Sequence, residues 1–267
     1  MRLNTKSSFL LGYLCVMLIF WVGIQTSHIT NLKINLWWGI GINLIPTFGG
    51  LFGLHTAKRW GGMKSALGRA ISFLSLGLLS WAFGNWLWSY YNFFLLTDIP
   101  YPSLADVGYV AAVPLWITGI YYLSIATGAK FSMRRLGGRM YLFLLPILAT
   151  AFSYYTLFVI ARGGSFDWSH SNPLKIIFDL AYPIGDWLIL TLAFLVWGLS
   201  LKYLGGRYKW PIFITLYGFV LMFIADFSFS YTTTLNTYFN GSISDLFFVM
   251  AMFVISFGVV SIDSKED

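Results

Sequence analysis

Long uncharged apolar stretches are the feature of this sequence that most restricts its fold. Four runs contain no Asp, Glu, Lys or Arg and cover 34–57, 70–97, 107–129 and 140–161. A helix of about 20 apolar residues crosses a bilayer core. Only 10% of the residues are charged, whereas a soluble domain has about 25%. The single cysteine, Cys15, allows no internal disulfide. The sequence therefore indicates an integral membrane protein and excludes a soluble enzyme, a disordered regulator and a disulfide scaffold.

We predict an all-α protein of eight transmembrane helices. Continuous apolar runs favour helices over the alternating pattern of a β-barrel. The gaps between them are too short for a second domain, so residues 1–267 are expected to form a single polytopic membrane domain. The predicted spans are 8–26, 35–55, 70–92, 107–127, 140–161, 175–201, 210–231 and 244–262.

The basic residues predict the orientation of these spans. If the N-terminus is cytoplasmic, all of the 17 Lys and Arg residues lie on the inner side except Lys33, Arg162 and Lys175. Inner loops of membrane proteins carry such an excess of positive charge. We therefore expect a multi-pass plasma-membrane protein with both termini in the cytoplasm. The net charge of +7 fits anchoring to anionic membrane lipids, and no loop is long enough for a nucleic-acid-binding module.

Most of the acidic residues fall on the opposite side. Asp106 lies at the predicted start of a helix, and Asp179 and Asp245 lie in or near a first turn, where a carboxylate can cap backbone N–H groups. Asp186 and Asp226 lie deeper, where capping is impossible. An isolated ionised carboxylate is too costly in hydrocarbon. No lysine or arginine lies at a matching depth in the sequence. We therefore expect both to face one cavity open to the outer side, with a proton, a hydroxyl or amide such as Ser228 or Asn85, water or an external cation as partner.

The spacing of the polar and aromatic residues indicates a ligand-binding wall. Asp179, Pro183 and Asp186 share one helix face, as do Trp81, Asn85 and Trp88. The alternative for Trp88 is the outer aromatic belt, to which we also assign Trp37 and Trp38. The predicted ligand-binding residues are Trp81, Asn85, Trp88, Asp179, Tyr182, Asp186 and Asp226, and the predicted structural caps are Asp106 and Asp245.

The sequence carries no recognisable catalytic or metal-binding motif. Its three histidines, His28, His55 and His170, form no i, i+4 pair. No lysine lies inside a predicted helix, which excludes a retinal Schiff base. We therefore expect no enzyme activity and specify no cofactor or metal.

A short internal repeat suggests paired helix hairpins. The segment 85–90 ends in Ser-Tyr and precedes a helix opening at Asp106, and the segment 226–231 ends in Ser-Tyr and precedes a helix opening at Asp245. The fifth span contains Ser-Tyr at 153–154 and precedes a third helix with an Asp-x-x-aromatic opening, at Asp179. Binding sites of membrane proteins often lie at the interfaces of such repeats.

Four motifs resemble the multi-pass N-terminal membrane regions of some prokaryotic diguanylate cyclases and histidine kinases. They are Pro-Ser-Leu-Ala-Asp-Val-Gly-Tyr at 102–109 with Pro114, Ala-Tyr-Pro-Ile-Gly-Asp at 181–186, Ala-Asp at 225–226 and Ser-Asp-Leu at 244–246. The resemblance covers about 100–262 and implies sensing at the membrane or its outer face. No cyclase or kinase follows Ile262, so signalling would pass through a partner chain.

Three functions remain open at this stage. The first is a membrane sensor or ligand-binding module that holds a lipophilic or cationic ligand and signals through a membrane or cytoplasmic partner. The second is a subunit of a larger membrane complex, and the third is a small proton- or cation-coupled transporter. The absence of acidic residues from the inner half of the predicted helices weighs against transport.

Overall fold

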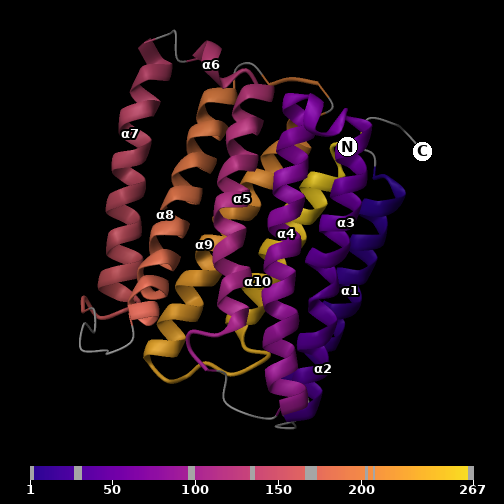
Figure 1. Cartoon of the computed structure of the whole chain (residues 1–267), viewed down its shortest axis with the longest axis vertical. Helices are drawn as coiled ribbons and strands as arrows, with labels where there is room; N and C mark the ends of the chain where they lie inside the picture. Colours follow the sequence, from indigo (N-terminus) through magenta and orange to yellow (C-terminus); the bar gives the residue numbers. More distant parts are fainter. Residues whose placement is uncertain are drawn as a thin grey trace.

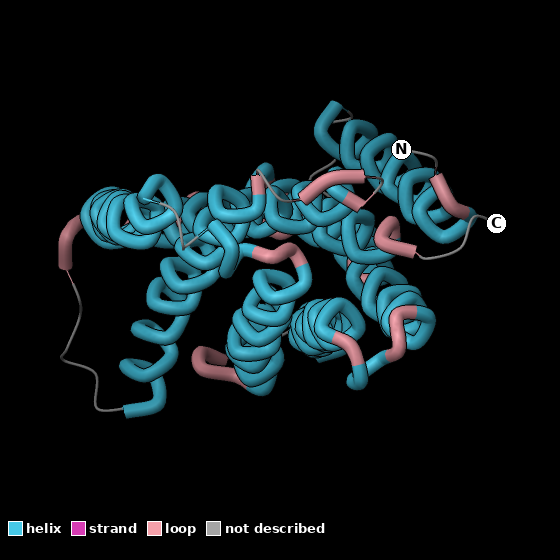
Figure 2. The backbone as a smooth tube through the Cα atoms, turned by 90° about the horizontal axis from the view of Figure 1, so that it is seen from above, coloured by secondary structure: helices cyan, strands magenta, loops and turns pink. Residues whose placement is uncertain are grey.

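The computed structural model describes residues 3–26, 32–95, 100–132, 136–165, 173–201, 204–206 and 208–263, and these form a bundle of helices without strands (Figures 1 and 2). The α-helices are α1 (Thr5–Thr26), α2 (Leu32–Ile42), α3 (Leu44–Arg59), α4 (Ala66–Tyr90), α5 (Leu104–Ala126), α6 (Ala129–Ser132), α7 (Leu136–Ser153), α8 (Pro173–Ser200), α9 (Lys209–Thr234) and α10 (Ile243–Val260). A 3₁₀ turn, η1 (Gly62–Lys64), precedes α4, and the π-helical segments η2 (Tyr91–Leu95) and η3 (Tyr154–Ile160) extend α4 and α7.

Seven helices of the described part of the chain are long and apolar enough to cross a membrane. They are α1, α4 with η2, α5, α7 with η3, α8, α9 and α10. Their bounds agree with seven of the predicted spans to within a few residues. The multi-pass, all-helical character expected from the sequence is therefore confirmed.

The predicted span 35–55 differs from the structure, because Asn43 separates α2 from α3. These helices have 11 and 16 residues, so neither alone is as long as a full span. Pro46 has no N–H to donate to the carbonyl of Ile42, which weakens the helix at this point. The side chain of Asn43 donates hydrogen bonds to the backbone oxygen of Asn85, at 3.3 Å, and to Oγ of Ser89, at 2.8 Å.

Two antiparallel hairpins, α4–α5 and α9–α10, form the most closely packed parts of the bundle. In the first, a side chain on Gly108 would come within 2.9 Å of the Cα atom of Gly84, so both positions require a small residue. In the second, a side chain on Gly218 would approach the backbone nitrogen of Ile255 to 2.8 Å. Helix packing through small residues is typical of membrane proteins. Two of the three predicted hairpins are thus the most closely packed helix pairs of the described residues, whereas the third, α7–α8, is packed less closely.

The first and last helices meet at one end of the bundle. Nζ of Lys6 lies 3.4 Å from the carboxylate of Asp263, and Arg59 donates to both oxygens of that carboxylate at 2.9 Å. Asn4 also donates to the carbonyl of Val260 at 3.0 Å. The helix ends next to α6 in Figure 1 lie on this same side. We call it the terminal end and the opposite side the loop end.

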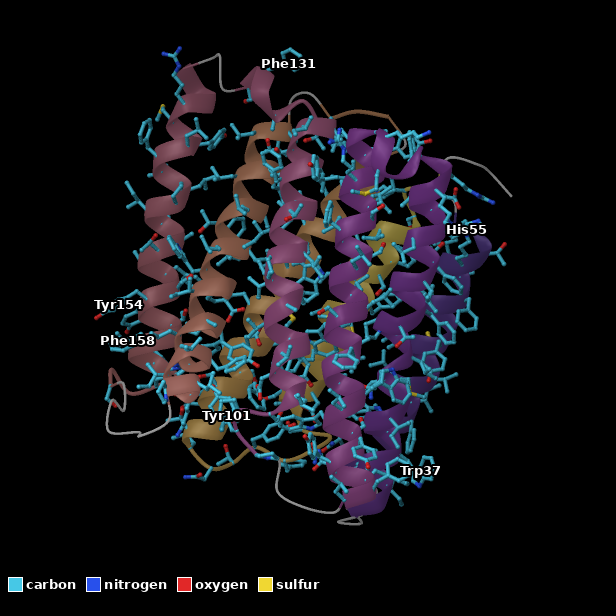
Figure 3. The ribbon with its side chains drawn as sticks, in the orientation of Figure 1. Trp37, His55, Tyr101, Phe131, Tyr154 and Phe158 are labelled. Carbon is cyan, nitrogen blue, oxygen red and sulfur yellow. The ribbon has the colours of Figure 1, made fainter. Side chains whose placement is uncertain are left out.

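The aromatic belt is only partly as predicted. Trp37 is 56% exposed near the loop end, as expected for a belt residue (Figure 3). Trp38 is 1% exposed and donates to the carbonyl of Met17 at 2.9 Å, so its assignment to the belt is wrong. Adjacent residues of a helix point in different directions, and here one indole faces outward while the other fills the space between α1 and α2.

Candidate ligand-binding site

A cavity of about 610 Å³ enters the bundle from the loop end. The exposed end of the cavity is lined by Ser165, Thr233 and Thr234. Its innermost lining residues include Trp116 and Phe219. Its walls come from α2, α4, α5, α8, α9 and α10. This volume lies within the range of about 300–1,000 Å³ that is usual for small-molecule sites.

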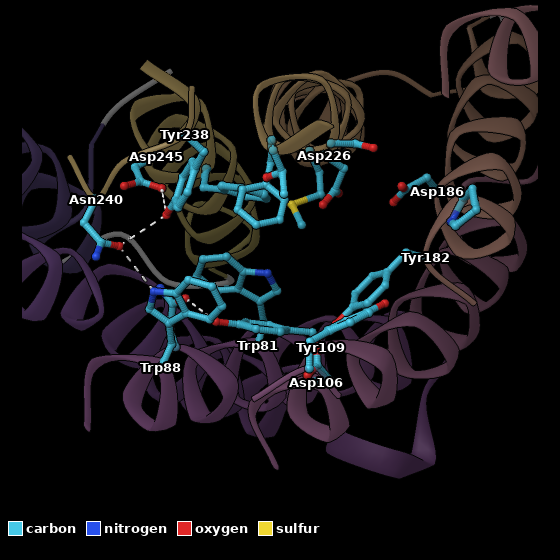
Figure 4. A pocket seen from close by; sticks show the side chains of 18 of the residues that line it. Trp81, Trp88, Asp106, Tyr109, Tyr182, Asp186, Asp226, Tyr238, Asn240 and Asp245 are labelled. Carbon is cyan, nitrogen blue, oxygen red and sulfur yellow. Dashed lines mark hydrogen bonds between the residues drawn. The ribbon is translucent and has the colours of Figure 1, made fainter. Parts of the chain in front are cut away.

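Aromatic rings form one wall of the cavity. Trp81 packs against Tyr109 with 5.7 Å between ring centroids and against Phe248 with 5.8 Å. Trp88 packs edge-on against Phe229 at 6.4 Å. Figure 4 shows Trp81, Trp88 and Tyr109 together on the same side of the cavity. Such a wall offers both apolar contact and ring faces that attract cations.

Asp106 faces the cavity and also caps α5. It is the third residue of that helix, and its carboxylate accepts the backbone N–H of Ser103 at 2.6 Å while Oγ of Ser103 accepts the N–H of Ala105 at 3.2 Å. This arrangement is a capping box. The other carboxylate oxygen of Asp106 accepts the hydroxyl of Tyr182 on α8, at 2.6 Å. The predicted cap is confirmed, and it also ties α5 to α8.

Asp245 holds the start of α10 in a similar way. Its carboxylate accepts the backbone N–H of Gly241 at 2.6 Å and the hydroxyl of Tyr238 at 3.0 Å. Burial and the neighbouring Asp245 carboxylate raise the pKa of Tyr238 well above its usual value, so its hydroxyl remains a donor. Asp245 therefore stabilises the start of α10 by holding the residues before it. Neither donor is an N–H group of the helix itself, so the predicted cap is confirmed in position only.

Asp186 on α8 and Asp226 on α9 face each other across the cavity (Figure 4). Both carboxyl groups line this cavity. Within the described part of the chain, no hydroxyl, amide or ammonium group donates a hydrogen bond to either of them. The suggested partners are engaged elsewhere: Ser228 bonds to Ser244 at 2.8 Å, and the amide of Asn85 bonds to Asn43. We refer to Asp186 and Asp226 as the acid pair.

Asp179 lies too far along its helix to be a cap. Since α8 begins at Pro173, the capping alternative for Asp179 is wrong. Its carboxylate instead accepts the hydroxyl of Tyr101 at 2.7 Å. Burial and this hydrogen bond raise the pKa of Tyr101. The bond joins the segment before α5 to α8 at the loop end.

The position of Arg162 contradicts the expectation that no basic residue lies near the acidic residues. Arg162 lines the cavity, and its charge acts on Asp186. Its guanidinium also donates to the backbone carbonyl of Asp179 at 2.9 Å. Pro183 cannot supply the usual helix bond to that carbonyl, so Arg162 replaces it. Sequence spacing could not reveal this, because Arg162 precedes α8 and reaches it only through the fold.

A polar network closes the α2 side of the cavity. Asn85 donates to Oδ1 of Asn43 at 2.7 Å and accepts the hydroxyl of Tyr109 at 2.7 Å. Asn240 accepts the indole N–H of Trp88 at 3.4 Å and the hydroxyl of Tyr238 at 3.3 Å. The Asn-Gly-Ser sequon at 240–242 therefore has its asparagine turned into the cavity.

The structure brings all the predicted site residues to one place. The seven predicted ligand-binding residues and both predicted caps line the same cavity. The lining residues that sequence reasoning missed include Asn43, Tyr109, Arg162, Tyr238 and Asn240. For Tyr109 a signal existed, because it lies three residues after Asp106 in the Asp-x-x-aromatic pattern. Asn43 and Asn240 gave none, since they reach the site through a helix break and a loop.

No further information on identity comes from similarity. Comparison of this chain with protein-family models, with curated proteins and with solved structures gave no match.

Proposed function

We propose that this chain is a membrane sensor or ligand-binding protein whose cavity holds a small cationic ligand with an apolar body. The single observation that supports this most is the acid pair, because no donor among the described residues forms a hydrogen bond to Asp186 or Asp226, although both line the cavity. The aromatic wall of Trp81, Trp88 and Tyr109 lies on the same cavity. A cation would satisfy the carboxyl groups, and the rings would bind its apolar part and add cation–π attraction.

The depth of the cavity favours binding over transport. The innermost lining residues include Trp116, Ile189 and Phe219, each well inside its helix. A cation-coupled transporter also needs polar groups along a path to the other face, and the described lining residues lie in the loop-end half or near the middle of their helices, or in loops at that end. We therefore place the chain with the sensors that its motifs resemble, and we propose that it signals through a partner chain.

We further propose that the chain crosses the plasma membrane eight times with both termini in the cytoplasm. The contact of Lys6 with Asp263 at 3.4 Å brings the first and last helices together, which fits an even number of crossings. The broken pair α2–α3 would be the eighth crossing. In support, Asn35 on α2 donates to the carbonyl of Asn240 at the loop end, and Arg59 at the end of α3 bonds to Asp263 at the terminal end. The excess of basic residues at the terminal end favours the cytoplasm for that side.

Single cysteines test this orientation. In a Cys15→Ala background, Thr237→Cys places a thiol in the exposed loop before α10, and Met63→Cys places one in the exposed turn before α4. An impermeant maleimide added to intact cells should label the first and not the second until the cells are opened. The reverse pattern would contradict the proposed orientation.

A matched pair of probes tests the proposed ligand class. Benzyltrimethylammonium and neopentylbenzene have the same shape, but only the first carries a positive charge. With purified protein in lipid nanodiscs, we expect benzyltrimethylammonium to bind at least about tenfold more tightly, because cation–π attraction at a desolvated site contributes about 2 kcal/mol. Calorimetry and quenching of tryptophan fluorescence measure this. Equal affinity for the two probes would refute a cation site.

A further inference from the structure

Three tryptophans of the described residues line the cavity, and their indole N–H groups differ in their partners. Trp88 donates to Oδ1 of Asn240 at 3.4 Å. Trp81 and Trp116 donate no hydrogen bond within the described part of the chain. Because buried tryptophans usually find an acceptor, each of these two unpaired groups needs an explanation.

The indole nitrogen of Trp116 is out of reach of a ligand. It is fully buried, and a side-chain carbon on Gly77 of α4 would collide with it. This edge of the ring therefore lies directly against the backbone of α4, and only the rest of the ring can border the cavity. The unpaired N–H of Trp116 belongs to the close packing of α4 against α5.

Trp81 is different, because its indole N–H is accessible from the cavity. The residue is 6% exposed and lines the cavity, but its nitrogen is not enclosed by protein atoms as that of Trp116 is. Figure 4 shows the indole of Trp81 across the cavity from Asp226. The rings of Tyr109 and Phe248, with centroids at 5.7 and 5.8 Å, hold it in this position.

Other polar groups of this side of the cavity bond to one another and not to Trp81. Oδ1 of Asn85 accepts the hydroxyl of Tyr109 at 2.7 Å. Oδ1 of Asn240 accepts the indole N–H of Trp88 at 3.4 Å and the hydroxyl of Tyr238 at 3.3 Å. Trp81 thus presents a hydrogen-bond donor to the cavity from within a wall of aromatic rings.

The charges around the cavity indicate which kind of acceptor fits this donor. The described basic residues that line the cavity are Arg162 and Lys175, and Arg162 already donates to the carbonyl of Asp179 at 2.9 Å. A negatively charged group of a ligand would be repelled by the more numerous lining carboxylates. An uncharged oxygen avoids this repulsion. The lining aspartates are Asp106, Asp179, Asp186, Asp226 and Asp245.

We propose that the ligand carries an uncharged oxygen acceptor, such as a carbonyl, ester or ether oxygen, in addition to its cationic group, and that the indole N–H of Trp81 binds this oxygen. This inference rests on the proposed function and narrows its ligand class. The acid pair lies on α8 and α9, whereas Trp81 lies on α4, so the charge and the oxygen occupy different points of the ligand. Trp81 then selects among cations of equal size, because a cation without the oxygen leaves the N–H unpaired.

Two cations of the same shape test this assignment. The para-acetyl and para-isopropenyl derivatives of benzyltrimethylammonium differ only in a carbonyl oxygen in place of a methylene group. In lipid nanodiscs, the wild-type protein should bind the acetyl probe about fivefold more tightly, as expected for one neutral hydrogen bond. Calorimetry measures both Kd values. In protein with isotope-labelled tryptophan, one indole N–H proton resonance should move downfield with the acetyl probe and not with the isopropenyl probe.

Two tryptophan variants identify the donor. Trp81→Phe removes the N–H and keeps an aromatic ring, so the ratio of the two affinities should fall to about one. The ratio is the readout because the smaller ring affects both probes alike. Trp88→Phe is the matched control, since the N–H of Trp88 already bonds to Asn240. It should keep the fivefold ratio, whatever its effect on either affinity alone.

The outcomes separate this inference from the proposed function. If both probes bind the wild-type protein with equal affinity, Trp81 binds no ligand oxygen, and the inference is wrong while the cation site stands. This result needs no variant, so it decides the matter even if Trp81→Phe does not fold. A preference that persists in folded Trp81→Phe would also overturn the inference. If neither cation binds, the proposed function itself fails.

Discussion

Two pairs of aspartates line the same cavity, but they differ in their hydrogen-bond partners. Asp106 and Asp245 each accept a backbone N–H and a tyrosine hydroxyl, at distances between 2.6 and 3.0 Å. Asp186 and Asp226 accept no hydrogen bond from another side chain or from the backbone of the described residues, and both line the cavity. The four side chains have the same chemistry, so the difference must come from their positions in the helices.

Position in the helix explains this difference. The first turn of a helix has N–H groups without intrahelical partners, and Asp106 and Asp245 are each the third residue of a helix. Asp186 and Asp226 lie far inside α8 and α9, where the backbone N–H groups are used by the helix itself. A carboxyl group at such a position depends on other side chains, on a proton or on a ligand. The comparison therefore separates acids that stabilise the fold from acids that are available for binding.

The largest effect expected from this comparison is on binding through the acid pair. Asp186→Asn or Asp226→Asn should weaken benzyltrimethylammonium binding about 100-fold, since removing one partner of a buried ion pair costs about 3 kcal/mol. The thermal stability of the unliganded protein should change little, because neither side chain holds a donor from another element. Binding calorimetry and a thermal unfolding scan in detergent measure both quantities. A large loss of stability without a loss of binding would place the acid pair among the structural acids.

The caps should show the opposite behaviour. Asp106→Asn and Asp245→Asn leave one acceptor oxygen where the carboxylate had two. One buried donor, from the backbone or from a tyrosine, then loses its partner. We expect each substitution to lower the free energy of unfolding by about 2 kcal/mol, with binding of the cation changed less than about threefold. Thermal unfolding scans of both variants measure the loss.

Tyr182→Phe and Tyr238→Phe are the matched controls, because they remove the tyrosine donor without leaving it unpaired. Each should lower the free energy of unfolding by about 1 kcal/mol. A strong loss of cation affinity in Asp106→Asn would mean that this acid, too, belongs to the binding site.

Helical periodicity and residue depth were sufficient to predict much of this site. The spacing of Asp179, Pro183 and Asp186 placed them on one face of α8, and all three line the cavity. Depth in the apolar run also separated Asp186 and Asp226 from the capping residues. These inferences use only local helix geometry, which a membrane helix follows closely because its backbone must satisfy its own hydrogen bonds.

The missing parts depend on contacts between distant segments. Hydropathy predicts 35–55 as one span, because α2 and α3 are both apolar and only one residue, Asn43, separates them. The hydroxyl of Tyr182 reaches Asp106 from 76 positions along the chain. Arg162 reaches α8 from the preceding turn. No local pattern specifies such pairings, because each depends on which helices become neighbours.

The smallest expected effect distinguishes the two caps from each other. Ser103 and Ser242 occupy the same position, immediately before α5 and α10. Oγ of Ser103 accepts the N–H of Ala105 at 3.2 Å and donates to Asp106 at 3.0 Å, whereas Oγ of Ser242 is buried without a hydrogen-bond partner among the described residues. Ser103→Ala should therefore lower the free energy of unfolding by about 1 kcal/mol.

Ser242→Ala, by contrast, removes a buried hydroxyl that forms no hydrogen bond with the described residues. The free energy of unfolding should then change by less than about 0.5 kcal/mol or rise slightly, because an unsatisfied buried polar group is itself destabilising. Thermal unfolding of the two alanine variants, recorded side by side in the same detergent, measures the difference. Equal losses in both would mean that Ser242 also caps its helix in the membrane and that Asp245 does not hold the start of α10 alone. If instead only Ser103→Ala loses stability, the repeated Ser-x-x-Asp arrangement works as a full capping box in the first hairpin and through its aspartate alone in the second.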